Sequence, residues 1–476
     1  MLQQWLIHFI LNPLAKFAQR FSGKMRDRMF TLAGVAVFVV FFLYSASVIR
    51  WRYLYTFAIS CFLLGVMILC SLEKEIKPVK FRLRLLLPLL GVGALTLLST
   101  VLNNVEYLFE ALLMTVAYPV VYICWNNADR EKLIRLLIRI IRISLVIFVV
   151  ASLLVIQITT RRYSGLFRNP NNCAFYLSMV CACLGAEILY RRSFDKNCIA
   201  DILLFAVAQA MIHYTNSRSG QLAVYALAAG GIVVYMLTHS KKENLGCLLR
   251  AGCCVLASAV FMSVLIYAFQ ARQLAPIPYY AKTTRTFYFT ERWEHLAGNQ
   301  QNFVGELPPE ESQQEDFFGT ESYDDFNDGK SNMEGKDLDR YSSGRLSIWK
   351  QYGSELNLLG HEEVPTIIIL NGDGMETEIH STHMTIMEVA YECGIPAGVL
   401  FLILNIMSGI LAVVYAWKNS AEKYALFPLM VILAFGVCSV FTAINGSFAY
   451  ISTLYYYLAM FPLMVKTQEE TAVQRA

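Results

Sequence analysis

Two short polar loops carry arginines in a pattern that favours phosphate binding. Residues 160–172 contain Arg161, Arg162 and Arg168, and a second loop contains Arg218. The planar guanidinium group of arginine forms paired, charge-assisted hydrogen bonds with phosphate oxygens. Two such loops at one membrane surface would clamp a pyrophosphate. Arginines near a membrane also extend toward lipid head groups, and this alternative stays open.

A histidine supplies a candidate proton acceptor. His383 lies in the segment His380-Ser-Thr-His383-Met384, just before an apolar helical pattern. A neutral imidazole at this position would take a proton from a sugar hydroxyl. An ordinary loop histidine is the alternative. The spacing of His380 and His383 also suits a metal, but no third strong ligand is placed nearby, so we expect no metal site.

The elements that position these residues are predicted to be membrane helices. Of the 476 residues, 56% are hydrophobic and 16% are charged, with a mean hydropathy of +0.46. Soluble domains have about 45–50% apolar and about 25% charged residues. This composition excludes a soluble enzyme, a coiled coil, a disordered chain and a collagen-like fibre. The formal net charge of +4 carries no clustered basic face, so nucleic acid is not an expected partner.

The hydrophobic pattern predicts an all-α polytopic membrane protein with about 12 transmembrane helices, each about 20 residues long. The 12 cysteines are scattered through apolar segments, which favours buried thiols over disulfides. The predicted spans are 28–49, 52–71, 84–101, 106–124, 137–157, 173–190, 198–214, 219–238, 249–269, 395–417, 424–443 and 446–465.

Lys and Arg in the short loops set the predicted orientation. They place both termini in the cytoplasm, with residues 1–27 as an interfacial helix and 466–476 as a tail. No cleavable signal peptide is expected. Residues 270–394, between helices 9 and 10, then form one large extracytoplasmic loop. Its acidic part, 306–339, holds twelve acids against two lysines and is expected to be mobile.

Several segments resemble the O-antigen ligase and O-antigen polymerase superfamily of bacterial surface polysaccharide assembly. The stretch from Arg162 to Asn171 is similar to the family's Arg-x-x-Gly-x-Phe-x-x-Pro-Asn loop. Ser217-Arg218-Ser219-Gly220 is similar to its Ser-Arg junction. His383, followed by Glu392 and Gly394, is similar to its histidine block, although Met384 replaces the usual Asn. Two further segments resemble motifs of the family: Gly344-Arg345-Leu-Ser-Ile-Trp349 and Leu359-Gly360-His361.

The resemblance implies a glycosyltransferase of the bacterial plasma membrane, with its active site facing outside. It would move a glycan from undecaprenyl pyrophosphate to an acceptor hydroxyl on a glycan or lipid, without metal or cofactor. Arg162 and Arg218 would hold the pyrophosphate, and His383 would be the general base. Arg161, Arg168, Asn169, Asn171 and Arg345 would bind substrate, and Glu392 would orient His383 or cap its helix. Membrane lipids and other proteins of polysaccharide assembly are the expected partners.

Two alternatives to an enzyme remain at the level of sequence: a non-catalytic sensor or scaffold, and a transporter. A transporter or flippase for the same lipid-linked sugar would be expected to carry ionisable residues along a midplane pathway. The intraspan acids lie instead near the ends of the spans, which favours the enzyme. Within the enzyme interpretation, polymerase and ligase share donor and motifs, so the sequence leaves that choice open.

Overall fold

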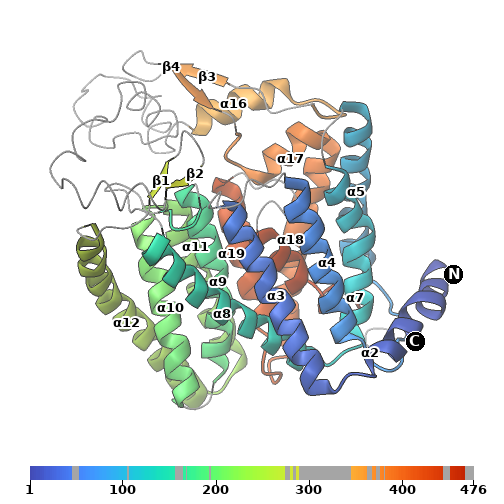
Figure 1. The fold of residues 1–476 in the computed structure, drawn as a ribbon, viewed down its shortest axis with the longest axis horizontal. Helices are drawn as coiled ribbons and strands as arrows, with labels where there is room; N and C mark the ends of the chain where they lie inside the picture. The colour runs from blue at the N-terminus through green and yellow to red at the C-terminus, as the bar shows by residue number, and fades with distance from the viewer. Residues whose placement is uncertain are drawn as a thin grey trace.

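The computed structural model describes residues 1–45, 53–103, 107–155, 164–167, 169–191, 194–273, 279–281, 286–288, 345–361, 367–370, 376–379, 381–442 and 451–466. In these parts the chain is predominantly helical and forms one bundle, with two short antiparallel hairpins outside it (Figure 1). The acidic segment 306–339 lies outside the described residues, as do Arg161, Arg162, Arg168 and His380.

The helices follow one another in the order that the hydropathy pattern predicts. They are α1 Leu2–Leu6, η1 Ile7–Leu11, α2 Asn12–Ala18, α3 Gly23–Ser45, α4 Tyr53–Ser71, α5 Leu83–Asn103, α6 Leu108–Leu112, η2 Leu113–Ala117, α7 Tyr118–Asn126, α8 Arg130–Val155, α9 Pro170–Tyr190, α10 Lys196–Tyr214, α11 Arg218–Thr238, α12 Lys241–Gln273, α16 Arg345–Glu355, α17 Thr385–Cys393, α18 Ile395–Lys418, α19 Phe427–Phe441 and α20 Ile451–Ala459. The strands are β1 Tyr279–Ala281, β2 Thr286–Tyr288, β3 Ile367–Leu370 and β4 Glu376–Ile379.

The membrane class predicted from the sequence is confirmed. Eight described helices are long and apolar enough to cross a membrane, and α4 and α19 contain shorter apolar helices. Helices satisfy their own backbone hydrogen bonds, so apolar segments in lipid adopt this form. All twelve predicted spans contain helix, but α8 and α20 are not among the candidates by length and apolarity. The number twelve therefore stays a prediction.

Helix α9 forms the centre of the bundle. It packs against α8, α10, α11 and α19, and nearly all of its side chains are buried. Small residues such as Ala174, Ser178 and Gly185 allow this close helix packing. The cysteines of this helix are buried, and all twelve cysteines are free, as predicted.

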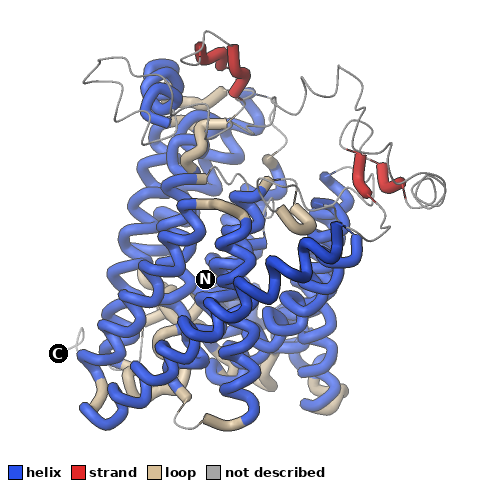
Figure 2. Tube along the Cα trace, turned by 90° about the vertical axis from the view of Figure 1, so that its left-hand side faces the viewer, coloured by secondary structure: helices blue, strands red, loops and turns tan. Residues whose placement is uncertain are grey.

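The described candidate polar residues lie at one end of the bundle. This end, which we call the α16 end, carries α16 and α17, the C-terminal ends of α5 and α19, and the N-terminal ends of α9 and α11 (Figure 1). Figure 2 shows the long helices running side by side toward this end from the loops at the opposite end. The fold therefore brings together polar segments that lie far apart in sequence, such as Ser99 and Glu392, which are 293 residues apart and share a hydrogen bond.

The N-terminal segment is helical, as the run α1–η1–α2, and its place at a membrane interface stays a prediction. It buries Ile7, Leu11 and Ala15 against the bundle, while Trp5 and Phe9 are exposed. Three hydrogen bonds tie it to the segment between α4 and α5: Gln3 and the C-cap residue Gln19 donate to backbone carbonyls, and Asn12 accepts from the Ile76 N–H. Helix α3 begins at Gly23, so the first long helix starts earlier than the predicted residue 28.

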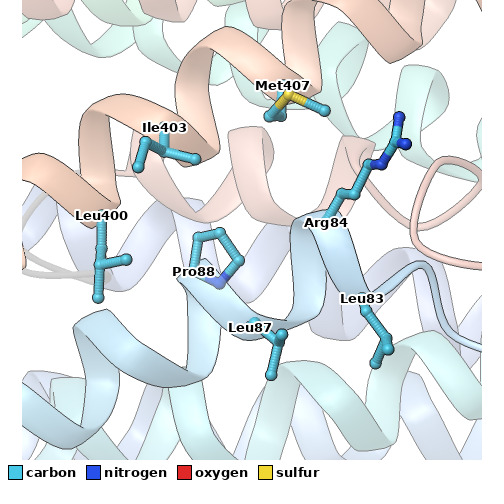
Figure 3. A pocket seen from close by; sticks show the side chains of 7 residues that line it. All are labelled: Leu83, Arg84, Leu87, Pro88, Leu400, Ile403 and Met407. Carbon is cyan, nitrogen blue, oxygen red and sulfur yellow. The ribbon is translucent and has the colours of Figure 1, made fainter.

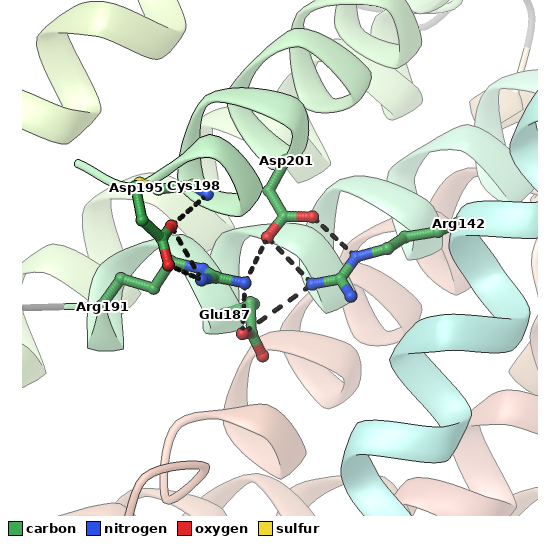
Figure 4. A network of polar contacts seen from close by, with 6 residues as sticks. All are labelled: Arg142, Glu187, Arg191, Asp195, Cys198 and Asp201. Atoms are coloured by element: carbon green, nitrogen blue, oxygen red, sulfur yellow. Dashed lines mark hydrogen bonds and ion pairs between the residues drawn. The ribbon is translucent and has the colours of Figure 1, made fainter. Parts of the chain in front are cut away.

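Arg142, which lies within the fifth predicted span, 137–157, is paired inside the bundle. Arg142 of α8 forms two hydrogen bonds with the carboxylate of Asp201 on α10, at 2.6 and 2.9 Å. Arg191 reaches Asp201 at 3.1 Å and Glu187 at 2.9 Å, and also pairs with Asp195 (Figure 4). Opposite charges make ionisable groups tolerable in a membrane helix, and here they join α8, α9 and α10.

Candidate functional site

His383 lies in a tightly held turn between strand β4 and helix α17. Its backbone has φ +53°, a left-handed conformation that is uncommon for a residue with a side chain. The preceding residue, Thr382, is fully buried. Thr382 donates its backbone N–H to a carboxylate oxygen of Glu388 at 2.7 Å, and its hydroxyl donates to the same oxygen. Trp349 donates its indole N–H to the Thr382 carbonyl at 3.0 Å. These contacts fix the turn that presents His383.

Helix α16 approaches His383 with two residues from one of its faces. Trp349 holds the turn, and Arg345, one helical turn earlier, lies close enough to act on His383 electrostatically. Burial first, and the positive charge of Arg345 second, lower the pKa of His383 to about 4. The guanidinium of Arg345 also lies over the ring of Phe441, 5.7 Å from its centre. At neutral pH the imidazole is therefore uncharged and able to accept a proton.

Glu392 lies one helical turn beyond Glu388 and faces α5 and α6. The Tyr107 hydroxyl donates to its carboxylate at 2.7 Å, and Ser99 donates to its backbone carbonyl at 2.6 Å. Burial and the neighbouring Glu388 raise the pKa of Glu392 well above its usual range. Glu392 thus connects α17 to α5 and α6, whereas the carboxylate that holds the histidine turn is Glu388.

Glu388 is the site residue that sequence reasoning missed. An acidic residue in the first turn of a helix complements the helix dipole, and Glu388 occupies that position in α17. This signal was present in the sequence. It did not reveal that the carboxylate bends back to Thr382, because that contact depends on the turn around His383.

Two glycines lock the segment after α16 onto the junction of α17 and α18. A Cβ atom on Gly360 would collide with the carbonyl oxygen of Glu392, and one on Gly394 would collide with that of Leu358. Both glycines have positive φ, +83° and +90°. Backbone hydrogen bonds run across the same contact, from His361 to Tyr391 and from Ile395 to Asn357. The Leu359-Gly360-His361 segment therefore packs against the C-terminal end of α17, the helix that follows His383.

Arg218 begins helix α11 at the same end of the bundle. Ser217 is the N-cap residue, and its hydroxyl accepts from the Gly220 N–H. Arg218 itself is exposed. The backbone carbonyl of the next residue, Ser219, accepts a weak hydrogen bond from the thiol of Cys438 on α19 at 4.0 Å. Gly220 packs closely on α9, where an added Cβ would lie 2.7 Å from the Ala174 Cβ.

The start of α9 holds the part of the first arginine loop that is described. Asn169 is the N-cap residue, and its side-chain oxygen accepts the Asn171 N–H at 2.8 Å. Gly165 has φ +57°, and an added Cβ there would lie 2.5 Å from Phe148. Phe167 is buried against Phe148 and other aromatic rings. Asn169 and Asn171 thus serve to begin the helix that follows the arginine loop.

Three of the segments described above contact the C-terminal end of α19. Cys438 contacts the Arg218 junction, Phe441 lies under Arg345, and the Thr442 carbonyl accepts from Thr385, two residues after His383. Residues 438–442 cover about 6 Å along a helix axis. The segments that carry Arg218, Arg345 and His383 therefore all contact one helix end. They come from α11, from α16 and from the turn before α17.

Within the described residues, no group of three or more His, Cys, Asp or Glu side chains has the arrangement of a metal site. Comparison with known protein families finds no matching family model. Comparison with curated proteins finds no match either.

Proposed function

We propose that this protein is a membrane glycosyltransferase that moves a glycan from a lipid pyrophosphate to an acceptor hydroxyl. One observation carries the proposal. A neutral, half-buried His383 lies near Arg345 beside the end of α19, and the junction that carries Arg218 contacts the same helix end through the Ser219 carbonyl. A proton acceptor beside cations is what displacement of a pyrophosphate by a hydroxyl requires.

In this proposal the imidazole of His383 takes the proton of the acceptor hydroxyl. The hydroxyl oxygen bonds to the anomeric carbon, and the bond from that carbon to the phosphate oxygen breaks. The electron pair of that bond leaves with the lipid pyrophosphate. Arg218 and Arg345 stabilise the negative charge that grows on the leaving group. A single displacement inverts the anomeric configuration.

Arg162, Arg161 and Arg168 are proposed as further pyrophosphate ligands. They lie outside the described residues, but the helix that follows them begins next to the Arg218 junction, through the contact between Ala174 and Gly220. Asn169 and Asn171 begin that helix. The loop that carries the three arginines therefore leads into the same end of the bundle as Arg218.

Charge supports the proposed orientation. Basic residues are concentrated in the described loops and helix ends at the end opposite α16, which is typical of a cytoplasmic face. These residues are Lys24, Arg26, Lys77, Lys80, Arg82, Arg130, Lys132, Lys196, Lys241, Lys242, Lys418 and Lys423. The α16 end, with His383 and Arg218, is then the outer face, where no nucleotide donor is required for a carrier-linked glycan.

Complementation tests the proposal in a strain that lacks this protein. The variants are His383→Ala, Arg218→Ala and Arg162→Ala, with His213→Ala as the matched control. His213 is an exposed histidine at the same end of the bundle. Surface glycan length is read on a gel, membrane abundance is checked by immunoblot, and carrier-linked intermediates are counted on each side of the membrane.

We expect wild type and His213→Ala to restore the surface glycan, while the three site variants accumulate outward-facing carrier-linked glycan. Long chains that depend on the protein for their length would identify a polymerase, and long chains that remain on the carrier without it would identify a ligase. Normal glycan in the abundant His383→Ala variant would refute the proposed chemistry. Intermediates trapped on the inner side would favour a transporter.

A further inference from the structure

A groove between helices α5 and α18 opens on the lateral surface of the bundle. It is lined by Leu83, Arg84, Leu87 and Pro88 of α5 and by Leu400, Ile403 and Met407 of α18, and its volume is about 560 Å³. Leu83 and Leu87 are 59% and 60% exposed. In a membrane, such an apolar lateral groove faces lipid chains. Figure 3 shows these side chains around the space between the two helices.

One end of the groove carries a positive charge. Arg84 lies in the first turn of α5, at the end of the bundle opposite α16, and its guanidinium points to the side of the groove near Met407 (Figure 3). Arg84 is exposed. Among residues that the structure describes, no hydrogen bond or ion pair of its side chain is found. Its charge is thus open to a ligand.

The backbone around Arg84 is fixed by a bridge to the C-terminal segment. Phe81 pairs with Val465, Arg82 donates its N–H to the Met464 carbonyl, and Lys466 donates to the carbonyl of Lys80. This pairing holds Lys80, Arg82, Arg84 and Lys466 on one ledge. The apolar part of α5 begins next to this ledge, so in a bilayer spanned by α5 these cations would lie at the depth of lipid phosphates.

We propose that this groove binds an anionic phospholipid of the membrane leaflet at the end opposite α16. One acyl chain lies against Leu87, Pro88, Leu400 and Ile403, and the phosphate lies at Arg84. A head group with net charge −1, such as that of phosphatidylglycerol, complements the cationic ledge. A zwitterionic head group adds its own cation beside Arg84 and binds more weakly. This inference does not depend on the proposed enzymatic function.

Lipid binding to the purified full-length protein tests the inference. The protein is placed in nanodiscs that contain phosphatidylcholine and a titrated fraction of phosphatidylglycerol, and bound lipids are counted by native mass spectrometry. The variants are Arg84→Gln, which removes the charge, and Leu400→Trp, which fills the groove. Arg20→Gln is the matched control, because Arg20 is an exposed arginine elsewhere at the same end.

We expect Arg84→Gln to weaken phosphatidylglycerol binding about fivefold and to leave phosphatidylcholine binding unchanged. Leu400→Trp should weaken both lipids, and Arg20→Gln neither. Equal phosphatidylglycerol binding by wild type and Arg84→Gln would overturn the proposal. An equal loss in Arg20→Gln would also overturn it, because the effect would then be unspecific attraction. If a polyisoprenyl phosphate displaced the bound lipid and phosphatidylglycerol did not, the occupant would be the polyisoprenyl phosphate and the proposal would be overturned.

Discussion

The ion-pair network between α8, α9 and α10 makes a quantitative prediction for Asp201→Asn. The side chain of Asp201 is 2% exposed and receives hydrogen bonds from Arg142 at 2.6 and 2.9 Å and from Arg191 at 3.1 Å. Asn has the same shape but no charge, and its amide nitrogen directs a donor at a guanidinium. Arg142 and Arg191 then share the carboxylate of Glu187 inside the bundle, and Arg191 keeps its pair with the more exposed Asp195.

Breaking a buried ion pair costs about 3–5 kcal/mol. The Arg142 side chain is 27% exposed, so water solvates part of the freed charge and the lower value of about 3 kcal/mol applies. The assay is thermal unfolding of the purified protein in detergent, together with denaturant titration. We expect a clear fall of the midpoint temperature and a loss of about 3 kcal/mol in the free energy of unfolding.

Asp195→Asn is the matched control. The Asp195 side chain is 45% exposed, and an exposed pair such as Arg191–Asp195 contributes only about 0–1 kcal/mol. Asn preserves its N-cap hydrogen bond to Cys198. The double variant Arg142→Leu with Asp201→Leu should recover much of the lost stability, because no unpaired charge remains. If Asp201→Asn were as stable as Asp195→Asn, the view that this network holds α8 in the bundle would be refuted.

Three further predictions concern the site. The rate of the proposed glycan transfer should be constant from pH 8 to about pH 5 and fall as His383 is protonated near its pKa of about 4. Arg345→Gln removes the neighbouring cation, so the fall in rate should begin at a higher pH. Glu388→Gln should lower kcat about ten- to a hundredfold in the same transfer assay, with KM nearly unchanged, because Thr382 loses a charged acceptor. Gly394→Ala should lower the thermal midpoint, since its Cβ would collide with a carbonyl oxygen, whereas Gly353→Ala, with open space around it, should not.

The pH profile also has a stability counterpart with a defined sign. The folded-state pKa of His383 is about 4, below the ordinary value of 6.5, so the unfolded chain binds more protons between these values. Folding stability should therefore decrease as pH falls from about 6.5 toward 4, and His383→Gln should remove that component. An unchanged slope in the variant would mean that another group titrates in this window.

Hydropathy along the chain was enough to predict the membrane class and the positions of the long helices. Runs of about 20 apolar residues leave helices as the solution in lipid, so the order of the long helices from α3 to α19 could be read from them. The buried cysteines and the start of α18 at Ile395 followed from the same pattern. The structure adds that Asn169 and Ser217 are N-cap residues, which act on amides only two or three positions away, whereas the resemblance implied substrate binding for Asn169.

Which polar residues meet could not be read from the sequence, because it depends on how the helices pack. Arg142 lies within a predicted apolar span, and its partner Asp201 is 59 residues away. Arg345, His383 and the Arg218 junction meet at the end of α19 because helices from different parts of the chain lie side by side. Such contacts follow from how side chains fit between helices, which a periodic pattern along one helix does not contain.

The roles of Glu388 and Glu392 also depend on tertiary contacts and could not be read from the sequence. The resemblance implied that Glu392 orients His383 or caps its helix. In the structure Glu392 accepts from Tyr107, and Glu388 holds the turn through Thr382. Both acids are spaced one helical turn apart in α17, so composition and spacing do not distinguish them. The distinction arises from the left-handed turn at His383, which directs the Thr382 donors at Glu388, and from α5 and α6, which receive Glu392.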